Sequence, residues 1–574
     1  MKIRTLKIFL LLTLTEGFLA ATWILLEKFL TGRGHVLPFV LSGLCLLDVA
    51  LIGFFLTRLD RNPVRAEKLL TRLNAWLRSG ERLFIVKDIL VVGLIFSLEG
   101  FLLTFLSFPL STRPVTVWAA LVFTQAWIVL LGSYRDLFRT RPGGLRLLRQ
   151  HWRGLEPVQR KTLIVLFAIA AVYFGFFAWV NWNGNTADPQ AFYAAGGDEV
   201  VIYPVSVEMV ASGDTFAANV YRFLIHEEYH YGYPYFYLNG LILFGSRLAF
   251  GPDFASHTQV NLLLLRQLVS VLPMILACLI FVYIVTRFKR MWFSTGMFVV
   301  MLLIPGVVRY NQHFWHPDAL MVLFVALTFY YLQRDRQRFG RDFYYAAVMC
   351  ALAAAVKLYG FFFFLAIAVY LITGLVRKIL SLKKMLLAGL AFLLVMGAAL
   401  LAFSPFLLVP SARQTMVSIL SGKTAEMETG YSEPDPENIY RTGMDAWIPF
   451  FALHYTQPYF FFFLFGALLL GSFLGPAKDL NRLLLAWCVV VAGYLIFFVA
   501  VKSYHYQLPL FLPLYAGGFL LPSILGDTSG AVSRFLQKPS TRRIVWGLTA
   551  AMIGSQFLFN LWAIFTSAYV RVYF

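Results

Sequence analysis

Long apolar runs recur along the whole of this sequence, each roughly 20 residues long, which is enough for a helix to cross a hydrocarbon core of ~30 Å. Inside lipid, only helices and closed barrels satisfy every backbone hydrogen bond. The runs are continuous and do not alternate between apolar and polar residues, so they indicate helices. We therefore predict an all-α polytopic membrane protein with about fifteen transmembrane helices, whose outer loops form the active site.

The net charge of +20 comes mainly from basic residues in short loops between the apolar runs. This distribution is the positive-inside pattern, which places those loops in the cytoplasm. It explains the excess of positive charge without a nucleic-acid partner, and we expect none. The same pattern predicts a cytoplasmic N-terminus, a bacterial inner membrane as the location, and an active site on the periplasmic face.

The apolar runs predict two regions. Residues 1–160 form an N-terminal module of four membrane helices whose role the sequence does not indicate. Residues 161–574 form the catalytic membrane core, with outer loops at 181–261 and 410–446. In the core, the predicted spans that meet near Lys357 and Tyr359 are short and closely joined, so the helix count is least secure there.

Chemistry-bearing side chains gather in three outer segments of the predicted topology. These segments are Asn181–Tyr237, Arg309–Asp318 and Lys502–Gln507, and Lys357 joins them at the end of a helix that runs outward. The candidate catalytic residues are Asp198, Glu199 and Asp318. The candidate substrate-binding residues are His230, Tyr233, Arg309, His316, Lys357, Lys502 and His505.

The polar stretch after the first core helix supports more than one interpretation. Asp198 and Glu199 fit either a catalytic pair or a solvated helix start. His226 and His230 are four residues apart, so on a helix they would share a face and fit a divalent metal site, which we leave open as a cofactor. The same histidines also fit a plain surface cluster.

The later candidates have structural alternatives as well. His316 and Asp318 are either functional or the cap of a helix that starts at Ala319. In the functional case, Asp318 holds a catalytic histidine, positions the acceptor or helps to bind a metal. Lys357 either contacts substrate or extends from an apolar helix to the lipid headgroups.

Several short motifs of the region Lys161–Phe574 resemble the GT-C superfamily of membrane glycosyltransferases, in particular its protein O-mannosyltransferase and aminoarabinose-transferase-like branch. An acidic pair follows the first core helix. The segment YHYGYPYFYLNGL resembles the family's His-Pro-Pro-Leu region but lacks its double proline. HPDALM opens a later helix, and AVKLYG and KSYHYQLPLFLP resemble the lysine-bearing and late outer-loop segments.

The resemblance implies an inverting glycosyltransferase that moves a sugar from a polyprenyl-phosphate donor to a glycan, lipid or protein acceptor. The acceptor hydroxyl must lose its proton, so a carboxylate base is needed; Asp198 is the first candidate and Glu199 the second. Lys357, Arg309 and Lys502 would stabilise the departing lipid phosphate.

Two other classes of function remain open from the sequence. A secondary transporter or lipid flippase would explain the many helices and the internal charges, although such proteins usually show paired repeats, which we do not find here. A non-catalytic membrane scaffold is the third class. It does not explain why the histidines and carboxylates gather on one predicted face.

Overall fold

The computed structural model describes residues 152–183, 198–211, 216–226, 228–430, 440–526 and 536–566, with the single positions 50, 68 and 71. The predicted N-terminal module of four helices therefore lies outside the described residues, apart from these single positions and the residues next to Lys161. Every regular element in the described part is helical, as predicted.

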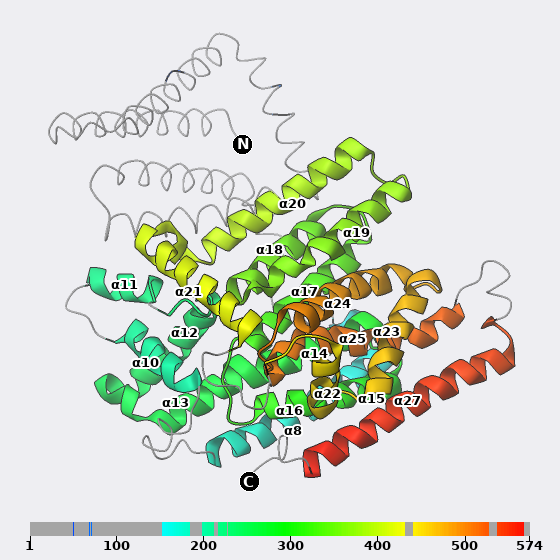
Figure 1. Cartoon of the computed structure of the whole chain (residues 1–574), viewed down its shortest axis with the longest axis horizontal. Helices are drawn as coiled ribbons and strands as arrows, with labels where there is room; N and C mark the ends of the chain where they lie inside the picture. The colour runs from blue at the N-terminus through cyan, green and yellow to red at the C-terminus, as the bar shows by residue number, and fades with distance from the viewer. Residues whose placement is uncertain are drawn as a thin grey trace. The chain divides into compact units, whose positions relative to one another are not determined.

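The described residues form a series of α-helices (Figure 1), with six short 3₁₀ or π elements between some of them. The elements are α8 (Pro157–Asn183), α10 (Asp198–Val210), α11 (Phe216–Leu224), α12 (Tyr233–Phe250), η1 (Gly251–Ser256), α13 (Thr258–Leu265), η2 (Arg266–Val271), α14 (Leu272–Thr286), α15 (Met291–Leu302), α16 (Pro305–Asn311), α17 (Asp318–Asp335), α18 (Arg341–Val356), η3 (Leu358–Phe362), α19 (Phe363–Val376), α20 (Leu382–Ala402), η4 (Pro405–Leu408), α21 (Pro410–Thr429), α22 (Met444–His454), α23 (Pro458–Phe473), α24 (Lys478–Phe498), η5 (Tyr504–Gln507), α25 (Leu508–Leu520), η6 (Leu521–Gly526) and α27 (Pro539–Thr566).

Seven helical stretches of the described residues are long and apolar enough to cross a membrane. Two further pairs qualify only if each is counted as one broken span: α15 with α16, bent by 63°, and α22 with α23, bent by 99°. By length and composition, these helices identify the chain as an integral membrane protein.

Two of the spans predicted for the core match no candidate span even when both bent pairs are counted. They correspond to α17, which ends in Gln-Arg-Asp, and to α18, which has only 16 residues and leads to Lys357. Neither is among the stretches that qualify. The two segments predicted as outer loops contain helices of their own, namely α10, α11, α12 and α21.

The chain divides into two compact units. One consists of Met1–Arg153, Gly213–Ile225 and Gly397–Arg413, and its described elements are α11, η4 and adjoining parts of α20 and α21. The other consists of Gly154–Ser212, His226–Met396 and Gln414–Phe574. All the candidate site residues belong to this second unit.

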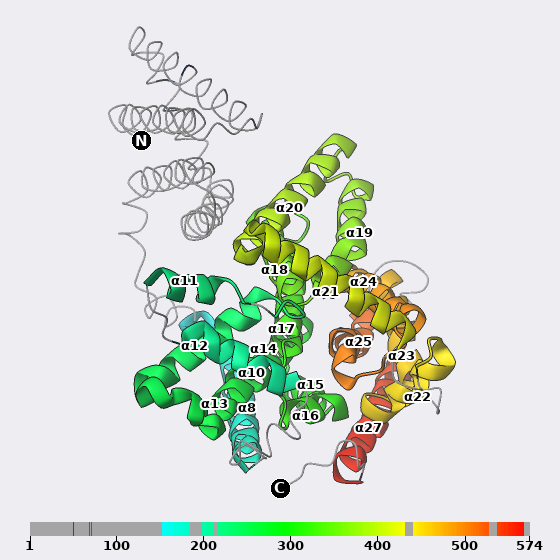
Figure 2. The same cartoon turned by 60° about the vertical axis from the view of Figure 1, so that its left-hand side comes forward.

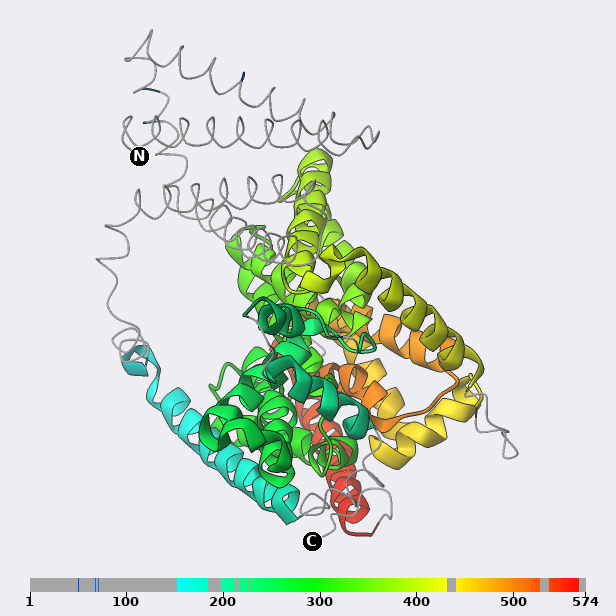
Figure 3. The same cartoon turned by 90° about the vertical axis from the view of Figure 1, so that its left-hand side faces the viewer.

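The core of the second unit lies around α25, all of whose residues are buried. It packs against α14, α17, α23 and α24 (Figure 1). On another side of the unit, α12 packs against α10 and α13 (Figure 2). By contrast, only 22% of the most apolar window of α8 or α27 is buried, so these two helices present most of their surface outward (Figure 3).

Candidate active site

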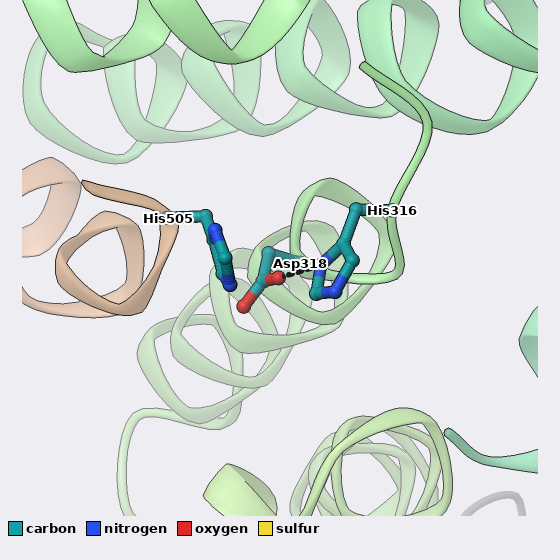
Figure 4. A group of neighbouring side chains, drawn as sticks. All are labelled: His316, Asp318 and His505. Atoms are coloured by element: carbon teal, nitrogen blue, oxygen red, sulfur yellow. Dashed lines mark hydrogen bonds and ion pairs between the residues drawn. The ribbon is translucent and has the colours of Figure 1, made fainter. Parts of the chain in front are cut away.

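Side chains from the ends of several helices meet around Asp318, the first residue of α17. His316 lies in the loop before that helix, and Lys357 follows the last residue of α18. His505 comes from the short helix η5, which leads into the buried α25. Figure 4 shows His316 and His505 on opposite sides of the Asp318 carboxylate. The structure thus brings together residues from three segments that are far apart in sequence.

Asp318 is fully buried and is bound by two side chains. Lys357 Nζ lies 2.9 Å from its Oδ1, and His316 Nδ1 makes a short hydrogen bond to its Oδ2. Burial would raise the pKa of Asp318, but the Lys357 ammonium and the neighbouring imidazoles hold it well below its usual value. The helix α17 begins at Asp318 itself and its N-cap residue is Pro317, so Asp318 does not occupy the cap position of a helix that starts at Ala319.

His316 is buried and connects Asp318 to the exposed part of the site. Its Nε2 lies 2.8 Å from the Tyr231 hydroxyl and 3.7 Å from Asp198 Oδ2. Burial lowers the pKa of His316, so its neutral form is favoured. In that form the Nδ1–H of His316 donates a hydrogen bond to the ionised Asp318. Nε2 then has no proton and can accept a hydrogen bond from the Tyr231 hydroxyl.

The backbone of His316 is hydrogen-bonded through both its carbonyl oxygen and its N–H. The carbonyl of His316 accepts a hydrogen bond of 2.5 Å from the Tyr310 hydroxyl. That hydroxyl also accepts from the Ala319 backbone N–H at 3.0 Å. The His316 N–H donates to Ser270 Oγ at 3.4 Å. These contacts fix the imidazole in position relative to α17.

The two acidic residues at the start of α10 have different surroundings: Glu199 is buried and Asp198 is exposed. The Glu199 side chain is 1% exposed. Arg266 donates two hydrogen bonds to its carboxylate, from Nε at 3.0 Å and from Nη2 at 2.5 Å. Burial raises the pKa of Glu199, and the guanidinium of Arg266 opposes that shift. The neighbouring Asp198 side chain is 53% exposed. Glu199 therefore anchors the start of the helix, while Asp198 is accessible to a substrate.

Tyr231 stands between Asp198 and His316, and its hydroxyl lies 3.4 Å from Asp198 Oδ2. Burial raises the pKa of Tyr231, so the phenol stays protonated and acts as a donor. The next residue, Gly232, donates its N–H to the Val356 carbonyl at 3.1 Å. A Cβ at this glycine would lie 1.3 Å from the Ala355 carbonyl oxygen. Only glycine allows the loop to rest on the end of α18 and present Tyr231 to the site.

His505 completes the cluster from the other side. Its ring centroid lies 4.5 Å from that of His316, and its Nδ1 lies 2.8 Å from Ser503 Oγ. One ligand atom from each of His316, Asp318 and His505 lies within 4.8 Å of the other two. Among the described residues, this buried trio is the group that could hold a metal ion.

The other predicted substrate-binding residues lie at different places in the same unit. The Arg309 guanidinium lies 5.9 Å from the ring centre of Tyr504, the neighbour of His505. Lys502 Nζ donates to the backbone carbonyls of Arg441, at 2.7 Å, and Ala500, at 3.1 Å. Tyr233 is the buried first residue of α12. The structure thus gives Lys502 a role in holding the chain.

The predicted pairing of His226 and His230 is wrong in its geometry. The helices α11 and α12 end at Leu224 and begin at Tyr233, so the two histidines lie in the connection between them and share no helix face. His226 is buried and stacks on Phe236 with ring centroids 4.3 Å apart. The His230 side chain is 43% exposed and binds Glu228. A metal site made by this pair is therefore not supported.

Two residues of the site were missed by the sequence interpretation. Arg266 interrupts the apolar run LLLLRQLVSV, and a charge inside such a run is a functional candidate by default, so a signal was present. It also opens the π-helix η2, a rare element that is frequent at functional sites. Tyr231 had no distinguishing signal, because it is one of several tyrosines in the same segment.

No protein-family model and no curated protein matches the chain. The fold and the site together describe an integral membrane protein in which a carboxylate, an imidazole and an ammonium group meet at helix ends. The motif resemblance to membrane glycosyltransferases stays a prediction.

Proposed function

We propose that this protein is an inverting glycosyltransferase that moves a sugar from a polyprenyl-phosphate donor to an acceptor hydroxyl. The supporting observation is the division of the acidic pair: Glu199 is buried against Arg266, and Asp198 is exposed beside His316 and Tyr231. A general base must be both anchored and accessible, and this arrangement provides both properties.

In the proposed reaction, Asp198 accepts the proton of the acceptor hydroxyl as its oxygen attacks the anomeric carbon. The bond between that carbon and the donor phosphate breaks at the same time, and the lipid phosphate leaves with the electron pair. The Tyr231 hydroxyl has one proton, which it donates either to His316 Nε2 at 2.8 Å or to Asp198 Oδ2 at 3.4 Å; in the second arrangement it orients the base. Asp318 acts as a positioning residue, because it holds His316 in one tautomer and orientation.

The leaving phosphate needs fixed positive charge nearby. Lys357 is the first candidate, since its side chain is 17% exposed and its ammonium is held at 2.9 Å by Asp318. Arg309, over the ring of Tyr504, is the second. The reaction would take place at the periplasmic face of a bacterial inner membrane, where a polyprenyl donor and a glycan, lipid or protein acceptor can both reach these helix ends.

The position of the site supports an enzyme over a transporter. Transporters place their sites near the middle of the bilayer, between broken helices of two repeats. Here Asp198 and Asp318 are the first residues of helices, and Lys357 follows the last residue of one. A layer of groups at helix ends suits a reaction at a membrane surface.

The test is transfer of radiolabelled sugar from a polyprenyl-phosphate donor pool by the purified full-length protein. We expect Asp198→Asn to reduce transfer by about 10²–10⁴-fold, the usual contribution of a general base. Asp253→Asn is a matched control, because Asp253 is an exposed acid on η1. Unchanged transfer by the Asp198 variant would refute the assignment of the base. Substrate flux into vesicles without sugar transfer would favour a secondary transporter or flippase.

A further inference from the structure

The cluster of His316, Asp318 and His505 has the composition of a metal site, which is a property independent of the proposed sugar transfer. All three side chains are buried, and one ligand atom from each lies within 4.8 Å of the others. Two imidazoles and one carboxylate form a donor set that suits zinc and similar transition metals. Calcium and magnesium prefer sets made of oxygen alone.

Both imidazoles are oriented by a second hydrogen bond, as the imidazoles of metal sites almost always are. Metal binding through Nδ1 requires the His316 tautomer that carries its proton on Nε2, the opposite of the one favoured without metal. Nε2–H then donates to the Tyr231 hydroxyl at 2.8 Å, and Nδ1, which faces Asp318, has its lone pair available. Nδ1 of His505 lies 2.8 Å from Ser503 Oγ, which leaves Nε2 available. Figure 4 shows the His505 ring reaching toward the Asp318 carboxylate from the side opposite His316.

We propose that His316 Nδ1, His505 Nε2 and Asp318 bind a divalent transition metal, with zinc as the best-fitting ion. Zinc bonds of about 2.0–2.1 Å would place the ligand atoms about 3.3 Å apart, so the site is completed when His316 Nδ1 and Asp318 Oδ2 separate from their short hydrogen bond and His505 adjusts to the same spacing. Three protein ligands leave a fourth position open, as in catalytic zinc sites.

Lys357 determines what can occupy the fourth position. Its ammonium lies 2.9 Å from Asp318 Oδ1, so metal and ammonium would share one carboxylate and leave excess positive charge. An anionic oxygen balances that charge, and a phosphate group is an anion that both cations bind well. The alternative is that Lys357 is the permanent counter-ion of Asp318 and excludes a metal.

The experiment is zinc titration of the purified full-length protein in detergent after removal of metal with a chelator. Bound zinc is measured by elemental analysis, and affinity by competition with a fluorescent chelator. We expect a single equivalent to bind. His505→Ala removes one ligand, and its zinc affinity should fall by at least about 100-fold. Ser503→Ala should lower the affinity by about 10-fold through the orienting hydrogen bond.

A matched control makes the result specific to these residues. His257→Ala removes an exposed histidine outside the trio, and this variant should bind zinc as the unaltered protein does. If His505→Ala does not fold, His505→Gln replaces it with a side chain of similar length. Absence of stoichiometric zinc, or equal zinc affinity in the unaltered protein and both His505 variants, would overturn the proposal. Neither outcome depends on sugar transfer.

Discussion

Two buried aspartates lie at opposite ends of α17, and their surroundings differ in kind. Asp335, the last residue, accepts backbone N–H groups of Phe339 and Gly340, both at 2.9 Å, and the Tyr370 hydroxyl at 2.6 Å. Asp318, the first residue, is bound by the side chains of Lys357 and His316. The Asp335 carboxylate is bound by two backbone amides and a phenol, whereas the Asp318 carboxylate is bound by an ammonium and an imidazole.

The turn after Asp335 explains its partners. Arg336, Gln337 and Phe339 all have positive φ values, between 51° and 60°, which is costly for residues with a Cβ. A carboxylate that collects the amides of this turn stabilises the conformation. No comparable turn surrounds Asp318, whose partners are long or ring-shaped side chains. The comparison separates a structural acid from an acid suited to chemistry.

The largest expected effect is on sugar transfer by Asp318→Asn. The amide cannot hold His316 in its present tautomer and loses the ion pair with Lys357. We expect a decrease of about 10⁴-fold, the size seen when the orienting carboxylate of a catalytic histidine is neutralised. Asp335→Asn, measured per folded protein, should retain transfer. Equal losses in the two variants would remove the distinction between the two ends of α17.

A smaller effect is expected from Gly232→Ala, which leaves every titratable group in place. The added methyl would lie 1.3 Å from the Ala355 carbonyl oxygen, so the loop and Tyr231 must move. A displacement of about 1 Å commonly costs about 100-fold in rate. Gly245→Ala is the control, since nothing lies within 4 Å of a Cβ there. The prediction concerns sugar transfer, and normal transfer by Gly232→Ala would show that the position of Tyr231 is unimportant.

The sequence predicted several members of the site because their local motifs were distinctive. His316, Asp318, Lys357 and His505 were expected to meet at one face, and the structure places them in contact. That expectation needed only the direction of each helix. Which member of the acidic pair faces outward could not be predicted, because it depends on the pairing of Glu199 with an arginine far along the chain.

Helix count was predicted less well, for a physical reason. Hydropathy identifies apolar runs but does not show whether a run faces lipid or the protein interior. α17 is largely buried among other helices, and α18 is short and rich in alanine, yet both resembled spans. The pairing of His226 with His230 failed similarly, because a spacing of four residues has meaning only on a helix.

Asp335→Asn should act on stability, where Asp318→Asn acts on rate. The replacement removes the negative charge that binds two backbone N–H groups and turns one oxygen into a donor facing a donor. We expect the free energy of unfolding to fall by about 2–3 kcal/mol, the range for lost hydrogen bonds to a charged group. Denaturant unfolding in detergent measures it. If Asp335→Asn lowered the free energy of unfolding by less than Asp318→Asn does, the structural role of Asp335 would be contradicted.

A buried histidine outside the site extends the comparison to pH. Burial lowers the pKa of His226 from 6.5 to about 3, and a hydrogen bond with the backbone of Glu228 opposes the shift only in part. Below about pH 6.5 the unfolded chain binds a proton that the folded chain refuses, so stability is lost as pH falls. His226→Phe keeps the stacking on Phe236 and removes this loss. The pH dependence of the unfolding free energy should become shallower by up to about 1.4 kcal/mol per pH unit between neutral pH and about pH 5, while His257→Phe leaves it unchanged. Identical slopes in the unaltered protein and His226→Phe would mean that His226 takes up its proton without unfolding, through opening of the connection between α11 and α12.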